Sequence, residues 1–300
     1  MASFKNVVIV GASGNIGKII VDALIRAPQF KLTAVTRSSS NATFPTGVKV
    51  YKSDFSESDL VSAFTGQDVV ISAVGLGGFG DQKKLVDAAV RAGVKRFIPS
   101  EFSSNTLSPA VLQLLPVFGQ KLEVLEYLKT KEASGLTWTG IWTALLFDWG
   151  LGNGFLGYDL SARTATIWDD GNSVFTLTNA EQLGLSVVSV LERPEKTANK
   201  NLYVASVETS QNDILTALEK ATRSKWTVTK TTTEKEVSEA LEKLGKGDLS
   251  GAFALVRATS FGNTQGIRAN YAKDEELANE LLGLQLESVE DTVGKVVKSV

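Results

Sequence analysis

The 300-residue chain contains no cysteine and no histidine, and these absences exclude several kinds of chemistry. Without cysteine there is no disulfide, thiolate nucleophile or thiolate-bound metal, and without histidine there is no imidazole general base. Positive and negative residues nearly balance, at 31 Lys+Arg against 33 Asp+Glu, and no basic cluster indicates nucleic-acid binding. We therefore expect no metal site, and we expect any catalysis to use lysine, tyrosine, hydroxyls, carboxylates or a bound cofactor.

Long hydrophobic runs are also missing from the sequence. No apolar stretch approaches the ~20 residues that span a bilayer. The first residues run directly into a strand pattern, without the apolar core and cleavage site of a secretory signal. We therefore expect a soluble, cytoplasmic protein whose partner is a small-molecule substrate rather than a membrane or a nucleic acid.

The first half of the chain alternates short β-branched runs with helical patterns. Residues 6–10 (NVVIV) form an uninterrupted apolar run, which is typical of a strand buried on both faces. This alternation predicts an α/β fold, a doubly wound parallel sheet of the Rossmann type with helices on both faces. The further strands are predicted at 31–37, 48–54, 68–75, 95–102 and 136–146.

A glycine-rich stretch, GASGNIG, follows the first predicted strand and opens the first helix. Its glycines permit a tight turn and let backbone N–H groups approach a pyrophosphate at the positive end of the helix. The spacing suits the short-chain dehydrogenase variant of the dinucleotide-binding loop, and a purely structural strand–helix joint is the alternative. The cofactor contacts expected here are Gly11, Ser13, Gly14, Asn15, Ile16 and Gly17.

Arg37 ends the second predicted strand, where an NAD-binding chain usually places an acidic residue for the ribose hydroxyls. A guanidinium can bind a 2′-phosphate through two hydrogen bonds, so Arg37, with the neighbouring hydroxyl of Ser38, favours NADP(H). A solvated surface arginine is the alternative. Asp54, which closes the third strand, is predicted to border the adenine, with a simple turn role as the alternative.

The second half of the chain is less regular and predicts a smaller α+β domain. Residues 164–178 are interpreted as a β-hairpin that turns at Asp170-Gly171-Asn172. We expect residues 1–150 to form the NADP-binding domain and residues 151–300 mainly the substrate-binding domain. The segment 179–207 is expected to pack back onto the first domain.

Three features of the first half stand in a fixed order: GASGNIG, then Gln82 with the stretch at 85–102 that ends in AGVKRFIPSEF, and then Lys121 on the next helix. Together they resemble the isoflavone-reductase-like branch of the NmrA-like atypical short-chain dehydrogenases, which includes phenylcoumaran benzylic ether, pinoresinol–lariciresinol and eugenol-forming reductases. The resemblance covers the whole chain and implies NADPH binding and a catalytic lysine at Lys121. Ser103 stands where the family has glycine, and LLFDWG at 145–150 also differs, so the departures concern the substrate more than the fold.

The helix around residues 119–131 offers two lysines for one catalytic role. Tyr127 and Lys131 form a Tyr-x-x-x-Lys pair like that of many short-chain dehydrogenases, whereas Lys121 has apolar neighbours one helical turn away. A lysine on an apolar face is costly when charged and buried, so we interpret it as functional, with snorkelling to solvent as the alternative. Desolvation favours the neutral amine. We predict that Lys121 is the general acid/base and that the Tyr127–Lys131 spacing is fortuitous.

These features predict an NADPH-dependent reductase that transfers hydride to a conjugated carbon or carbonyl of an aromatic or secondary-metabolite-type molecule. Two alternatives remain open, an NADP-binding redox-sensing regulator without turnover and a cofactor-assisted isomerase or cyclase without net redox change. Glu101 is expected to border the nicotinamide, and a purely structural role is its alternative. The remaining expected cofactor contacts are Ala73, Val74, Gly75, Gln82, Ser100, Glu101 and Phe102. The expected substrate contacts are Phe147, Trp149 and Phe155, and for each of them a place in the hydrophobic core is the alternative.

Overall fold

The fold was analysed in a computed structural model that describes residues 4–299. The chain divides into two compact units whose segments interleave along the sequence. The first unit contains the described residues up to Phe102, then Val117–Ile141 and Leu183–Leu202. The second unit contains Ser103–Pro116, Trp142–Gln182 and the described residues from Tyr203 onward.

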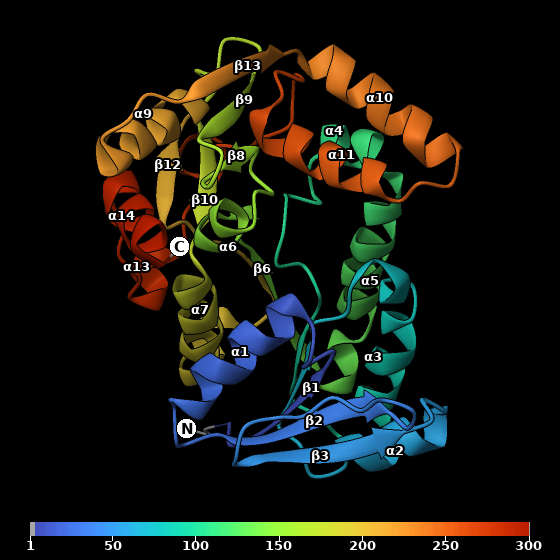
Figure 1. The fold of residues 1–300 in the computed structure, drawn as a ribbon. Helices are drawn as coiled ribbons and strands as arrows, with labels where there is room; N and C mark the ends of the chain where they lie inside the picture. Colours follow the sequence, from blue (N-terminus) through green and yellow to red (C-terminus); the bar gives the residue numbers. More distant parts are fainter. Residues whose placement is uncertain (1–3, 300) are drawn as a thin grey trace. The chain divides into compact units, whose positions relative to one another are not determined.

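A seven-stranded sheet forms the centre of the first unit, in the order β11-β6-β5-β4-β1-β2-β3 (Figure 1). The pairings from β6 to β3 are all parallel, which confirms the predicted Rossmann-type sheet. The central strands are buried, as expected for strands covered on both faces, and they are largely apolar except for the buried Arg96 of β5. The strands are β1 (Asn6–Val10), β2 (Lys31–Arg37), β3 (Val48–Ser53), β4 (Val69–Ser72), β5 (Arg96–Ile98), β6 (Thr137–Trp142) and β11 (Lys200–Tyr203).

Helices cover this sheet from both sides, with α1 and α7 together and α3 beside α5 (Figure 1). Gly184 of α7 lies against α1, where an added Cβ would be only 2.6 Å from the Cβ of Ala23, so the glycine permits close helix packing. The helices are α1 (Asn15–Ile25), α2 (Glu57–Phe64), α3 (Gln82–Arg91), α5 (Gly119–Thr130), α7 (Ala180–Glu192) and α8 (Pro194–Thr197), with 3₁₀ turns at Leu76–Gly78, Pro116–Phe118 and Glu132–Ser134.

The second unit contains two three-stranded sheets, β12-β10-β7 and β13-β9-β8. Its core gathers aromatic residues such as Phe147, Trp168 and Phe175. The strands are β7 (Leu145–Leu146), β8 (Tyr158–Asp159), β9 (Thr164–Trp168), β10 (Phe175–Thr178), β12 (Val207–Thr209) and β13 (Thr227–Thr231). The helices are α4 (Pro109–Leu114), α6 (Phe147–Gly152), α9 (Gln211–Thr222), α10 (Thr233–Gly245), α11 (Ser250–Phe261), α12 (Tyr271–Asp274), α13 (Asn279–Leu282) and α14 (Val289–Ser299).

The hairpin predicted over residues 164–178 is wrong, because β9 and β10 belong to different sheets. One edge of β9 pairs in parallel with β13. On the other edge, the first two residues of β9 pair with β8 in antiparallel fashion. The side chain of Gln211 continues that second edge, since its Nε2 donates to the carbonyl of Thr166 at 3.0 Å and its Oε1 accepts from the N–H of Trp168 at 2.8 Å. These partners leave β10 no free edge of β9 to pair with.

Among the described residues there is neither a helix that could span a membrane nor a group of potential metal ligands. Within residues 4–299, no helix has the length and apolar character that crossing a membrane requires. The same residues contain no group of three potential ligands placed to hold a metal ion.

Candidate cofactor and catalytic site

The glycine-rich stretch forms the turn between β1 and α1. Gly11 has a φ of +83°, and a Cβ there would lie 2.5 Å from the carbonyl oxygen of Ala73, so the position requires glycine. A Cβ on Gly17 would lie 2.2 Å from the carbonyl oxygen of Gly11. Gly14 differs, because its nearest neighbour would be 3.4 Å away. Two of the three glycines are therefore required by the packing of the turn itself.

The amino-terminal end of α1 suits an anion. Gly14 is the N-cap and offers no side-chain cap, and the first turn contains no acidic residue. The first backbone N–H groups of a helix lack intrahelical acceptors, and the helix dipole adds positive potential there. Ser13 and Asn15 are exposed at this end and Ile16 is half-buried. The end of α1 therefore has the geometry that receives the pyrophosphate of a dinucleotide.

Arg37, Ser38 and Asp54 lie at the carboxyl ends of β2 and β3. Arg37 is exposed, and it pairs in register with Ser53, the last residue of β3. The N–H of Ser38 donates to the carbonyl of Ser53 at 2.8 Å, which holds the two strand ends together. The carboxylate of Asp54 accepts from the N–H of Ser56 at 2.7 Å, so Asp54 at least shapes the turn before α2.

The segments after β4 and β5 are joined by Gln82 and Ser100. Ser100 Oγ donates to the carbonyl of Val74 at 2.8 Å, and the N–H of Ser100 donates to Gln82 Oε1 at 2.9 Å. Gln82 is fully buried, and its Nε2 donates to the carbonyl of Phe79. Ser100 therefore joins the segment that begins with it to the segment 73–75, and Gln82 holds Ser100 against the turn at Phe79.

Lys121 lies near the start of α5, and only 3% of the residue is exposed. Its Nζ donates to the carbonyl oxygen of Glu101 at 2.7 Å. The same nitrogen lies 4.7 Å from the ring centroid of Phe79 and 4.6 Å from that of Phe118. The amine is thus enclosed by two aromatic faces and anchored to the segment 100–102. Phe118 is visible in the sequence at helical spacing from Lys121, whereas no sequence signal points to Phe79.

The protonation of Lys121 follows from this environment. Burial lowers the pKa of its ammonium from 10.5 to about 8, and the nearby carboxylate of Glu101 offsets part of the effect. The direction agrees with the expected influence of desolvation. A pKa of about 8 leaves the ammonium form in excess by roughly ten to one at pH 7. Lys121 can therefore donate a proton near neutrality and accept one at moderately higher pH.

Tyr127 and Lys131 share a carboxylate on the neighbouring helix. Tyr127 Oη donates to Asp87 Oδ1 at 2.6 Å, and Lys131 Nζ lies 3.0 Å from the same oxygen. Hydrogen bonds to Tyr127 and Asp87 raise the pKa of Lys131, which keeps it charged. These contacts tie the end of α5 to α3 and give the Tyr-x-x-x-Lys spacing a structural role.

The three residues expected to contact substrate have different surroundings within the second unit. Phe147 is fully buried in the core, whereas Trp149 is 39% exposed. The ring of Phe155 lies 5.8 Å from that of Trp149 and 6.2 Å from that of Phe253 on α11. The guanidinium of Arg257, also on α11, lies 5.7 Å from the centroid of Phe155. Sequence reasoning missed Phe253 and Arg257, because they lie far along the chain in a helix without a motif.

Comparison with known proteins identifies the family. The model of the NmrA-like family matches residues 3–267. The chain is 40% identical over 295 residues to the oxidoreductase aprR of Aspergillus flavus, and the match covers 97% of this chain and 98% of that protein. This chain belongs to the NmrA-like family.

Plant reductases share the same fold. Phenylcoumaran benzylic ether reductase 1 of Arabidopsis thaliana is 30% identical over 226 residues, covering 68% of this chain and 70% of that protein. The structure of the leucoanthocyanidin reductase–NADPH complex from Vitis vinifera aligns with a TM-score of 0.79 at 18% identity, covering 98% of this chain and 99% of that one. The resemblance to isoflavone-reductase-like proteins, carried by GASGNIG, PSEF and Lys121, is thereby confirmed.

Proposed function

We propose that this protein is an NADP(H)-dependent oxidoreductase that reduces a small aromatic molecule, with Lys121 as the proton-transfer group. The observation that carries the proposal is the buried Lys121 amine, hydrogen-bonded to the carbonyl of Glu101 and enclosed by two phenylalanine rings. The match to a protein named as an oxidoreductase along nearly the whole chain supports net redox chemistry.

The parallel sheet brings the expected cofactor-binding residues to the carboxyl ends of its strands. The stretch 11–17 would receive the pyrophosphate, because its glycines allow close backbone approach. Arg37 and Ser38 would hold the 2′-phosphate, with Asp54 beside the adenine. Segments 73–75 and 100–102, joined by the hydrogen bond from Ser100 to Val74, would border the nicotinamide. Bound NADPH would supply a hydride there.

Lys121 would complete the reduction by moving a proton. Near neutral pH its ammonium form predominates, so it can donate a proton to the oxygen that becomes negative as the substrate carbon accepts a hydride. The carbonyl of Glu101 and the faces of Phe79 and Phe118 all favour a positive charge at this nitrogen. They also orient the amine, which limits the positions from which it can transfer the proton.

The aromatic cluster in the second unit is proposed to contact the substrate. Trp149 and Phe155 offer ring faces for an aromatic substrate, and Phe253 extends the same cluster. Arg257 adds a positive charge, and burial lowers the pKa of its guanidinium. Phe147 belongs to the core cluster against which Phe155 packs, so it would support the ring of Phe155.

The direct test is NADPH consumption, measured at 340 nm with a panel of conjugated aromatic ketones and cyclic benzylic ethers. We expect at least one acceptor to be reduced, with product mass higher by two hydrogens. Tight NADPH binding without turnover of any acceptor would favour the redox-sensing regulator. A product of unchanged mass, formed with only catalytic amounts of NADP⁺, would favour the isomerase or cyclase.

A further inference from the structure

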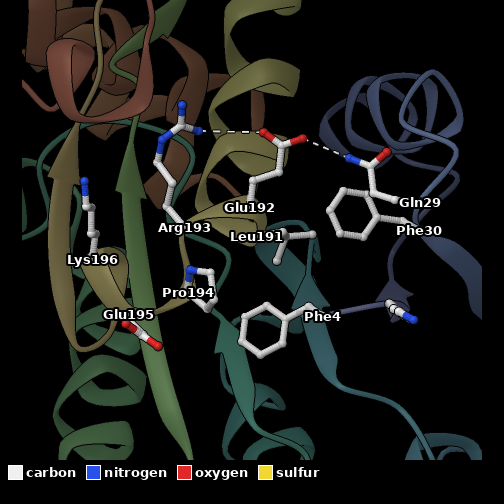
Figure 2. A pocket seen from close by; sticks show the side chains of 10 residues that line it. Phe4, Gln29, Phe30, Leu191, Glu192, Arg193, Pro194, Glu195 and Lys196 are labelled. Carbon is white, nitrogen blue, oxygen red and sulfur yellow. Dashed lines mark hydrogen bonds and ion pairs between the residues drawn. The ribbon is translucent and has the colours of Figure 1, made fainter. Parts of the chain in front are cut away.

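A cavity of about 400 Å³ opens in the first unit at the amino-terminal ends of strands β1 and β2 (Figure 2). It is lined by Phe4, which precedes β1, by Phe30, which precedes β2, and by the end of α7 with the start of α8. The parallel strands β1 and β2 both begin beside the cavity, and the glycine-rich loop follows the carboxyl end of β1. The five residues of β1 separate the two sites by ~16 Å, so the cavity is distinct from the cofactor site.

The floor of the cavity is apolar. Phe4, Phe30 and Leu191 are buried, and Pro194 is half-buried beside them. Figure 2 shows these four side chains gathered across the middle of the cavity, with the charged side chains around them. The volume and the aromatic lining suit the ring system of a small organic molecule.

A buried cation lies behind this floor. Arg96 is 1% exposed, and its guanidinium lies 5.5 Å from the ring centroid of Phe4. Its hydrogen bonds go to neutral acceptors, the carbonyl of Pro194 and the hydroxyls of Thr137, Thr139 and Thr197. Burial alone lowers its pKa to about 10, so it stays charged near neutral pH. The ring of Phe4 separates this guanidinium from the cavity, and apolar side chains screen charge less than water does. The positive potential of Arg96 therefore extends into the cavity.

The rim of the cavity is also positive on balance. Lys5, Arg193 and Lys196 contribute three cations, against the carboxylates of Glu192 and Glu195. Glu192 is already engaged, since it accepts from Gln29 Nε2 at 2.8 Å and lies 3.7 Å from Arg193. Together with Arg96, the positive groups outnumber the negative ones and leave a net attraction for an anion.

We propose that this cavity is a second ligand site, which binds a small aromatic anion such as an aryl carboxylate or sulfonate. The rings of the ligand would lie on Phe4, Phe30 and Leu191, and its acidic group would meet the basic rim. The positive field would discriminate against neutral molecules with the same rings.

Two fluorescent probes that differ by one anionic group test this proposal. 8-Anilino-1-naphthalenesulfonate carries a sulfonate, and N-phenyl-1-naphthylamine has the same ring system without it. Both are titrated into protein saturated with NADP⁺, so that the cofactor site is filled. We expect the sulfonate probe to bind about tenfold more tightly, and we expect it to slow hydrogen exchange in residues 189–197.

Two matched charge-reversal variants test whether the basic rim causes the preference for the sulfonate probe. Lys196→Glu should weaken the sulfonate probe about fivefold and leave the neutral probe within about twofold. Lys298→Glu makes the same change at an exposed position of the second unit and should alter neither probe. Equal affinity for both probes, equal effects of the two reversals, or protection confined to other segments would each overturn the proposal. Both lysines are exposed, so either variant should fold normally.

Discussion

Lys121 lies in α5 and Lys131 directly follows that helix, and the surroundings of each lysine determine its pKa. Lys121 is buried against two aromatic rings and a carbonyl, so its pKa falls to about 8. Lys131 is paired with Asp87 and Tyr127, so its pKa rises and its charge is held in a surface contact. A proton-transfer group needs a pKa near the working pH, and only the first lysine meets that condition.

The pH dependence of turnover should follow the ammonium form of Lys121. As pH rises through about 8 the ammonium is lost, so kcat/KM should fall above that value if the amine is the proton donor. Lys121→Met should be slow and should lack this inflection. The profile is measured with saturating NADPH and the best acceptor. A rate that instead rises through pH 8 would assign Lys121 as a base, and a flat wild-type profile would contradict any proton-transfer role.

Arg37 should determine the choice of cofactor. We expect NADPH to bind at least ~10-fold more tightly than NADH, because a guanidinium can hold the 2′-phosphate through charge-assisted hydrogen bonds. Arg37→Ala should weaken NADPH by ~1.5–3 kcal/mol and leave NADH nearly unchanged, as measured by calorimetry. Arg26→Ala, at an exposed position after α1, serves as the control. Equal weakening of both cofactors by Arg37→Ala would refute the 2′-phosphate contact.

At the scale of elements, the strand–turn–helix unit β1–α1 combines a packing requirement with a binding surface. Gly11 and Gly17 are needed because a Cβ at either position would collide with backbone atoms. The start of α1 has no side-chain cap, and its first turn contains no acidic residue. The conformation that the glycines permit is therefore the same one that presents N–H groups to an anion.

Gly17→Ala and Gly14→Ala separate these requirements. The Cβ at residue 17 would lie 2.2 Å from a backbone oxygen, so Gly17→Ala should lower the free energy of unfolding by ~1–3 kcal/mol and weaken NADP⁺ binding. Gly14→Ala adds a Cβ that meets only one atom, at 3.4 Å, and should keep near-normal stability. Thermal unfolding and calorimetric titration of both variants provide the measurements. Equal stability of the two variants would mean that the turn relaxes without cost.

Local sequence patterns predicted the parallel sheet well, because buried parallel strands are continuous apolar runs that need no distant information. The same patterns failed at 164–178, where the turn residues suggested a hairpin. There the partners of β9 are β13, β8 and the side chain of Gln211, all set by long-range packing. A polar side chain that completes a strand edge leaves no periodic signal in the sequence.

The candidate site was predictable only in part for the same reason. Motif spacing pointed to Lys121 and to the glycines of the β1–α1 turn. Phe79, which covers the Lys121 amine, and Arg257, which lies over Phe155, come from segments remote in sequence. Their positions depend on how segments distant in sequence pack together, and local sequence patterns do not predict that packing.

At the scale of the whole molecule, each unit is assembled from separated segments of the chain. The first unit takes in Val117–Ile141 and Leu183–Leu202, and the second begins with Ser103–Pro116. Hydrophobic periodicity indicates that a segment forms a strand or helix, but not which unit it joins. Lys121 therefore belongs to the first unit although it follows Ser103–Pro116, a segment of the second unit, in the sequence.

Single-turnover reduction with saturating NADPH tests the central claim most directly, using Lys121→Met and Lys131→Met with the acceptor that wild type reduces. Lys121→Met keeps an apolar stem of similar length in the buried position and removes the amine. We predict that it lowers the rate of the chemical step by ~10²–10⁴-fold while changing NADPH affinity little. Lys131→Met and Tyr127→Phe should stay within a few-fold of wild type. Normal turnover by Lys121→Met, with loss of activity in Tyr127→Phe, would contradict the account.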